Sequence, residues 1–307
     1  MKWTASSFLG TALILIGAGL SSCHRLAMDP DLERFTVSVK GQERVYYARR
    51  PSQPPEAVIF AFHGAGGEPR RFDAVAGGLR QAAQDKAFLV IYPEGLDRSW
   101  NDGRAQMHAD HDDVAFFDSM LIDVSKRFEV STQKVFATGI SNGGFMSFRL
   151  ACERSHKLGA IAVVAAGMSR DLAAHCQPSQ PVSILQFFGS ADPVIPAEGG
   201  PIRLPFTFRT RGEVLSQDAG WDLWRQWNHC SGQSQEEEPS AKGAAYPLKR
   251  FHWTGCPVGV EGERTLIQGA GHVWPGGVQY LPQFLVGPIS PVPDTNQLLV
   301  NFFARHR

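Results

Sequence analysis

Short apolar runs alternate along the chain with segments that have the length and periodicity of helices. The runs predict strands at 57–62, 88–92, 135–138, 158–166, 182–188 and 265–268, most of which break into glycine-rich or polar turns. Helices are expected at 74–86, 112–128, 143–153 and 295–305, the last with Asp294 as its candidate N-cap. Because apolar strands separated by helices favour parallel pairing, the pattern predicts an α/β fold, with a mostly parallel central sheet and helices on both faces.

The region before the first of these strands has a different pattern. Polar and apolar residues alternate over 35–50, which predicts a β-hairpin with Lys40-Gly41-Gln42 at its turn. No internal repeat and no linker follows it. We therefore expect one catalytic domain over residues 35–307.

The N-terminus resembles an export signal. Lys2 precedes an apolar run at 8–20, which is shorter than the about 20 residues that span a bilayer. The run ends in Leu20-Ser21-Ser22-Cys23, which is similar to a bacterial lipobox. We expect a lipoprotein signal peptide at 1–22, a lipidated Cys23 and a tether over 23–34. Residue 24 is His rather than Asp, which by resemblance to sorting in Gram-negative cells favours anchoring in the outer membrane. The alternative is an ordinary secretory signal.

Composition and charge narrow the possible partners. The 307 residues are 43% hydrophobic and 20% charged, which is typical of a globular protein. Thirty Lys and Arg balance thirty Asp and Glu, so the formal net charge is +0. Because no excess of positive charge is available to follow a phosphate backbone, we expect no nucleic-acid partner.

The cysteines fit an oxidising compartment. If Cys23 is lipidated, an even set of four remains: Cys152, Cys176, Cys230 and Cys256. Their spacing matches no compact zinc pattern, so disulfides are the better interpretation. Pairing between sequence neighbours is expected, Cys152 with Cys176 and Cys230 with Cys256, although four cysteines allow three connectivities.

One turn has the pattern of a nucleophilic serine. Gly139-Ile140-Ser141-Asn142-Gly143 lies between a predicted strand and a predicted helix, as in the G-x-S-x-G turn that exposes a serine hydroxyl. Asp192 and His272 follow two later strands, and the order Ser, Asp, His is that of α/β-hydrolases. We expect Ser141 as nucleophile, His272 as its base and Asp192 as the acid that orients the histidine. The alternative is that all three are ordinary turn and loop residues.

Acyl transfer also needs donors for the developing oxyanion. The amide of Asn142, directly after the serine, is one candidate. The second is an amide of the loop His63-Gly64-Ala65-Gly66-Gly67, and Ala65 is the residue we expect. The alternative is that this loop is only a flexible turn.

Six segments together resemble a known family: HGAGG, YPEGLDRSWND, DDVAFFDSML, GISNGGFMSFRLACE, FFGSADPVIP and GAGHVWPGG. They are similar to the esterase and polyhydroxybutyrate depolymerase family, which includes feruloyl and acetylxylan esterases of carbohydrate esterase family one. The resemblance runs from His63 to Gly277 and implies the α/β-hydrolase fold, the same Ser, Asp and His roles, and both disulfides. Segments 201–217 and 281–293 depart from the family pattern, so the acyl and leaving-group pockets do not carry over.

These observations predict a serine carboxylic-ester hydrolase that works through an acyl-enzyme, as a monomer and without cofactor or metal. The expected substrates are short-chain, aromatic feruloyl-type or hydroxyalkanoate oligomer esters. The closing helix ends close to Arg307, so we expect no separate polymer-binding module and little activity on dense polymer.

Two clusters leave other functions open. The His108–Asp113 segment (HADHDD) is rich in metal-ligand types and would suit a metal-dependent hydrolase, whereas the family resemblance makes it a solvated loop and a helix start. Trp221, Trp224 and Trp227 either form one packed helix face or line an aromatic or sugar pocket. A non-catalytic binding lipoprotein on the same fold is the remaining alternative.

Overall fold

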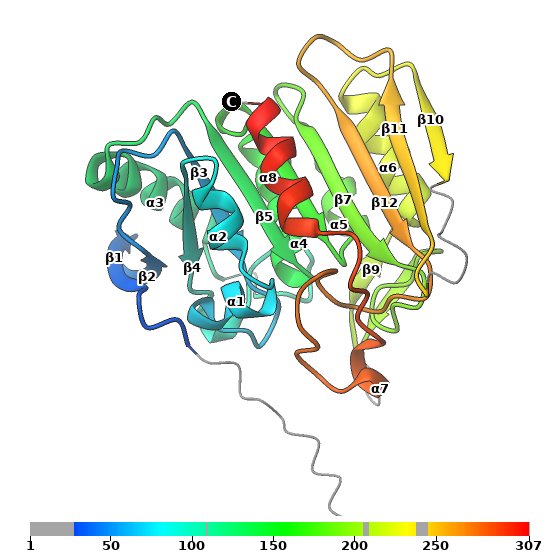
Figure 1. Ribbon diagram of the computed structural model, residues 1–307, viewed down its shortest axis with the longest axis horizontal. Helices are drawn as coiled ribbons and strands as arrows, with labels where there is room; N and C mark the ends of the chain where they lie inside the picture. Colours follow the sequence, from blue (N-terminus) through cyan, green and yellow to red (C-terminus); the bar gives the residue numbers. More distant parts are fainter. Residues whose placement is uncertain (1–27, 109, 205–208, 238–244, 307) are drawn as a thin grey trace, which may run out of the picture.

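A computed structural model describes residues 28–108, 110–204, 209–237 and 245–306. Within these ranges, ten strands form one sheet in the order β1-β2-β4-β3-β5-β6-β7-β12-β11-β10 (Figure 1). Pairing is parallel from β4 through β12 and antiparallel toward both edges. The strands of this sheet are β1 (Glu33–Val39), β2 (Gln42–Ala48), β3 (Ala57–Phe62), β4 (Phe88–Pro93), β5 (Val135–Ile140), β6 (Ala160–Val164), β7 (Ser183–Gly189), β10 (Gly232–Glu237), β11 (Leu248–Thr254) and β12 (Gly262–Ile267).

The central strands are buried along their whole length, because helices cover both faces of the sheet. One face packs against α3 (Asp113–Phe128), α4 (Asn142–Glu153) and α6 (Gln217–Trp227). The other packs against α1 (Pro69–Val75), α2 (Leu79–Gln84) and α8 (Thr295–Arg305), which lie in front of the sheet in Figure 1. The predicted α/β architecture and the hairpin of β1 and β2 are confirmed.

Three of the long helices begin at side-chain caps. Asp112 Oδ1 accepts a hydrogen bond from the Ala115 amide at 3.0 Å and so begins α3. Ser216 begins α6 and Asp294 begins α8 in the same way, with distances of 3.1 and 3.0 Å to the amides three residues on. Each cap satisfies an amide that has no partner inside the helix. The N-cap predicted for the closing helix is confirmed.

The single helix predicted at 74–86 is wrong. Two short helices, α1 and α2, occupy this region, and Gly77 and Gly78 between them have positive φ values of 73° and 95°. A Cβ on Gly77 would lie 2.9 Å from the carbonyl oxygen of Gly276. The helix is therefore interrupted where the backbone must approach the loop that follows β12.

Several elements were not predicted at all. β10 and β11 extend the sheet beyond β12, and the described side chains of β10 are mostly exposed, so the strand has no apolar run to reveal it. The divergent segment 201–217 contains a separate hairpin of β8 (Gly200–Arg203) and β9 (Thr210–Val214). The segment 281–293 contains the short helix α7 (Gln283–Val286). The remaining elements of the described chain lie earlier in the sequence. They are the short helix α5 (Arg170–Ala173) and two 3₁₀ turns, η1 (Leu96–Arg98) and η2 (Ser155–Lys157).

Both expected disulfides are present, Cys152 with Cys176 and Cys230 with Cys256. Because such bonds persist in oxidising compartments, they are consistent with an exported protein. The predicted signal peptide at 1–22 and the lipidation site Cys23 lie outside the described residues. Within the described ranges, no helix has the length and apolar character needed to cross a membrane.

Candidate active site

Ser141 lies at the sharp turn between β5 and α4. Its φ of 56° and ψ of −123° are values that residues with a side chain rarely adopt, so the turn is strained. The turn packs closely against the end of β3, and Gly143 allows this because it has no side chain. A Cβ on Gly143 would lie 2.0 Å from the carbonyl oxygen of Phe62. The predicted strand-turn-helix is confirmed, and Ser141 is only half-buried.

His272 and Asp192 are brought into direct contact by the loops after β12 and β7. His272 Nδ1 lies 2.7 Å from Asp192 Oδ2, and both side chains are at most 5% exposed. Asp192 Oδ1 accepts hydrogen bonds from the amides of Val194 and Ile195, at 2.7 and 2.9 Å. These amides hold the carboxylate in place, and the carboxylate in turn orients the imidazole.

Tyr280 also holds the backbone of His272 in place, in addition to the contact between His272 and Asp192. The Tyr280 hydroxyl donates to the His272 carbonyl oxygen at 2.9 Å. Burial, with the nearby charge of Asp192, raises the pKa of Tyr280, so its hydroxyl stays a donor. No sequence motif marks Tyr280, which lies eight residues after the histidine.

Ser141 and His272 stand on the same edge of the sheet, at the carboxyl ends of parallel strands. Within the described residues, the Ser141 hydroxyl makes no hydrogen bond to the His272 ring. Hydrogen bonds between a serine and its base are often long in free enzymes and tighten when substrate binds, so a missing contact does not exclude proton transfer.

The two expected oxyanion donors lie beside Ser141. A Cβ on Gly64 would be 3.5 Å from the Ser141 Cβ, so the 63–67 loop adjoins Ser141. The Gly66 and Gly67 amides are used within the fold, by the carbonyl oxygens of Arg98 and Gly64. The amides of Ala65 and Asn142 have no acceptor among the residues that the structure describes, which leaves them available to a ligand.

A buried polar network holds the Asn142 side chain. Its Oδ1 accepts from the Trp100 amide at 2.8 Å, and its Nδ2 donates to the Trp100 carbonyl at 3.0 Å and to Asp102 Oδ2 at 2.6 Å. Asp102 is 0% exposed and is paired with Arg104. Arg104 also donates to the Arg211 carbonyl oxygen of β9 at 2.7 Å. The turn that carries Ser141 is thereby fixed to the loop after β4 and to the β8–β9 hairpin.

His63 connects the loops that follow β3 and β4. Its Nε2 accepts from the Gly95 amide at 3.2 Å, so Nδ1 carries the proton and donates to the Gly64 carbonyl at 2.8 Å. Burial lowers the pKa of His63 to about 4, and the ring is therefore neutral at pH 7. The Trp100 indole donates to the His63 carbonyl at 2.9 Å. His63, Trp100 and Asp102 all lie in motifs that carry the family resemblance, but their roles depend on contacts that the motifs do not reveal.

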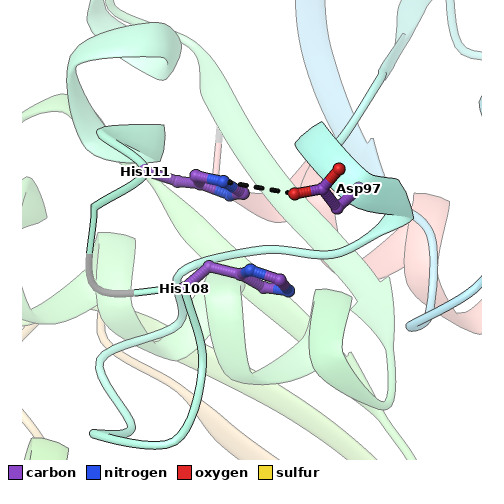
Figure 2. A group of neighbouring side chains, drawn as sticks. All are labelled: Asp97, His108 and His111. Atoms are coloured by element: carbon purple, nitrogen blue, oxygen red, sulfur yellow. Dashed lines mark ion pairs between the residues drawn. The ribbon is translucent and has the colours of Figure 1, made fainter.

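The His108–Asp113 cluster does not form one ligand set. Asp113 is 1% exposed and pairs with Arg44 at 2.7 Å, while Asp112 caps α3 and lies 2.5 Å from the Lys40 ammonium. The expected helix start is confirmed. His108 and His111 lie instead beside Asp97, which comes from η1 (Figure 2).

The tryptophan stripe is a packed helix face. Trp221 and Trp224 are 2% and 1% exposed, and Trp227 is partly buried against the same core. Trp221 lies 4.5 Å from Trp253, centroid to centroid, and Trp224 lies 5.8 Å from Phe148. Trp221 therefore packs on the sheet and Trp224 on α4, so the stripe belongs to the core rather than to a ligand pocket.

Comparisons with known proteins point to esterases. Feruloyl esterase C of Emericella nidulans is 29% identical over 258 residues, which cover 80% of this chain and 87% of that protein. A probable feruloyl esterase C of Aspergillus niger is 30% identical over 213 residues, covering 64% and 73%. The solved structure of an acetyl xylan esterase from Aspergillus awamori matches with a TM-score of 0.55 at 14% identity, over 79% of this chain and 94% of that one, which shows a shared fold. No protein-family model matches the chain.

Proposed function

Since the chain belongs to the α/β-hydrolase esterase family that includes the fungal feruloyl esterases, and is a carboxylic-ester hydrolase, we propose that Ser141 is its nucleophile. In this proposal His272 is the general base, Asp192 orients it, and the amides of Asn142 and Ala65 bind the oxyanion. The observation that carries the proposal is the 2.7 Å contact between His272 and Asp192 on the sheet edge where Ser141 occupies a strained turn.

The chemistry follows from the tautomer that this contact imposes. Neutral His272 donates from Nδ1 to Asp192, so the lone pair on Nε2 is free to take the Ser141 proton as the hydroxyl attacks the ester carbonyl. The oxyanion forms against the two free amides, and the imidazolium then protonates the departing alcohol. A water activated by the same imidazole hydrolyses the acyl-enzyme and restores Ser141.

Removal of the hydroxyl tests the assignment. We expect Ser141→Ala to lower kcat by about 10⁴ to 10⁶ while the melting temperature stays close to that of the wild type. A fluorophosphonate probe should label wild-type protein at Ser141, and activity should be insensitive to EDTA. Ser52→Ala is a matched control, because Ser52 is exposed in the loop between β2 and β3 and should leave both labelling and turnover unchanged.

The result also separates the alternatives. A Ser141→Ala protein with near-wild-type esterase activity, purified from a host without other esterases, would refute the proposal. Loss of activity in EDTA would favour a metal-dependent hydrolase. A wild-type protein that neither reacts with the probe nor hydrolyses any ester would favour a non-catalytic binding protein.

For the substrate, we propose esters of aromatic acids of the feruloyl type, together with short-chain esters and hydroxyalkanoate oligomers. The support is the similarity to proteins named feruloyl esterase C over more than two thirds of their length. Methyl ferulate, p-nitrophenyl acyl esters and hydroxybutyrate oligomers, compared at equal ester concentration, would rank these classes. A rate on polymer emulsion that matches the soluble esters would overturn the expectation of soluble substrates.

For the cellular location, we propose that lipid on Cys23 anchors the exported protein in the cell envelope. The lipobox-like sequence and the two disulfides support export, and the cysteine position supports the anchor. A diacylglycerol, with a further acyl chain on the amine, would hold the protein stably, since one chain gives only marginal binding.

A further inference from the structure

Three side chains with metal-ligating atoms meet on the long connection between β4 and α3. Asp97 comes from η1, and His108 and His111 come from the turn before α3 (Figure 2). One donor atom of each lies within 4.8 Å of the other two. None of the three belongs to the proposed catalytic machinery, so the cluster needs an explanation of its own.

The donor atoms of His111 and Asp97 lie close to each other without a hydrogen bond between them. His111 Nε2 lies 3.7 Å from Asp97 Oδ2, too far for a hydrogen bond, and 4.0 Å from Asp110 Oδ1. Two ligands of a tetrahedral zinc ion, bound at about 2.0 to 2.2 Å, lie roughly 3.4 Å apart. A small movement of the Asp97 side chain, which is 77% exposed, reaches that separation.

His108 is held in the manner of a metal ligand. Its Nε2 lies 2.6 Å from the hydroxyl of Ser99, which is 5% exposed. Histidines that bind metals usually give their second N–H to an oxygen, which fixes the ring and the tautomer. In the tautomer that donates Nε2–H to Ser99, the lone pair of His108 is on Nδ1 and is free to bind an ion.

The two imidazole rings are stacked, with centroids 4.6 Å apart and an angle of 3° between their planes. Each nitrogen donates in the plane of its own ring, so two parallel rings cannot both point at one ion. Metal binding therefore turns the His111 ring out of the stack, while the contact with Ser99 keeps His108 in place. In the described residues no other group of three histidine, cysteine or acidic side chains comes as close together.

We propose that Asp97, His108 and His111 bind a divalent transition-metal ion, with Asp110 within reach as a fourth ligand. Two imidazoles and a carboxylate suit zinc better than calcium or magnesium. The ion would tie η1 to the turn before α3.

Zinc binding is measured on untagged, metal-free, full-length protein by competition with a chromophoric zinc chelator, and Co²⁺ reports on the ligands through its visible absorption. We expect one tight equivalent in the wild type and at least 100-fold weaker binding in Asp97→Asn and in His111→Asn. Ser99→Ala should weaken binding by about 10- to 100-fold, because it removes only the support of His108. His156→Asn, an exposed histidine on η2, is the matched control and should bind as the wild type does.

Equal affinity in the wild type and in Asp97→Asn would overturn the proposal, as would the absence of any binding near one equivalent. Because Asp97 is exposed, its variant should fold normally, and circular dichroism checks this. Ser141→Ala protein should bind zinc as tightly as the wild type. If it does so while Ser141 proves unnecessary for hydrolysis, the metal site stands and the proposed function falls.

Discussion

Acid should destabilise the protein through His63, because this ring is buried in its neutral form. Burial lowers its pKa from 6.5 to about 4, so between these values the unfolded chain binds more protons than the folded one. The contribution of His63 to the free energy of unfolding therefore falls as the pH drops below 6.5 and is nearly constant above it. For these two pKa values the contribution lost between pH 7.5 and 4.5 is about 2.5 kcal/mol.

The physical cause is local. A protonated His63 has no lone pair on Nε2, so it must give up the hydrogen bond from the Gly95 amide while carrying a charge in a site only 2% exposed. His63→Gln offers an oxygen in place of that nitrogen and does not titrate. Comparison of the two proteins isolates His63, since all other titrating groups are shared.

Urea unfolding at pH 4.5 to 7.5 provides the measurement. We expect the wild type to lose about 2.5 kcal/mol more than His63→Gln over this range, and His156→Gln to follow the wild type because His156 is exposed. Parallel curves for wild type and His63→Gln would show that His63 titrates as it does in the unfolded chain. The neutral imidazole could then not be what joins the two loops.

Three further perturbations probe other parts of the molecule. Asp102→Asn should lower the free energy of unfolding by about 3 to 5 kcal/mol in a urea titration, because it leaves Arg104 charged and buried, and a loss below 1 kcal/mol would contradict this role of the carboxylate. Replacement of Cys152 and Cys176 by serine should cost about 3 kcal/mol in the same assay, and an unchanged melting temperature would show that the bond adds nothing. Cys23→Ala should release the protein from the membrane fraction of its host, whereas an unaltered distribution, or mature wild-type protein that begins at another residue, would count against the anchor.

Local pattern was sufficient for much of the fold. The central strands are runs of apolar residues that are buried on both faces, and such runs are visible in the sequence without any knowledge of their neighbours. The Ser141 turn was predictable for the same reason, because small residues on either side of a serine report a close backbone approach within a few positions. The disulfides followed from cysteine count, compartment and family resemblance.

Predictions failed where the deciding contact lies far along the chain or where the local signal is weak. The helix expected at 74–86 is broken at Gly77 because the backbone there packs against Gly276, about two hundred residues later. The described side chains of β10 are mostly exposed, and among the described strands it pairs with β11 alone, so no periodic apolar pattern marks it. Its place at the edge of the sheet depends on hydrogen bonds between backbones, which residue type hardly encodes.

The polar groups around the site show most clearly what the sequence determines and what only the fold decides. His63, Asp113 and Asn142 can be recognised in sequence motifs, but the partners that define what each side chain can do cannot. Arg44 neutralises Asp113 across 69 positions and removes it from any metal site, while Asp102 reaches Asn142 across 40. Whether a carboxylate or imidazole is charged, neutral or free to bind depends on burial and on partners within about 3 Å. Both are properties of the folded chain, so only the tertiary structure separates the groups beside Ser141 from the pair of histidines beside Asp97.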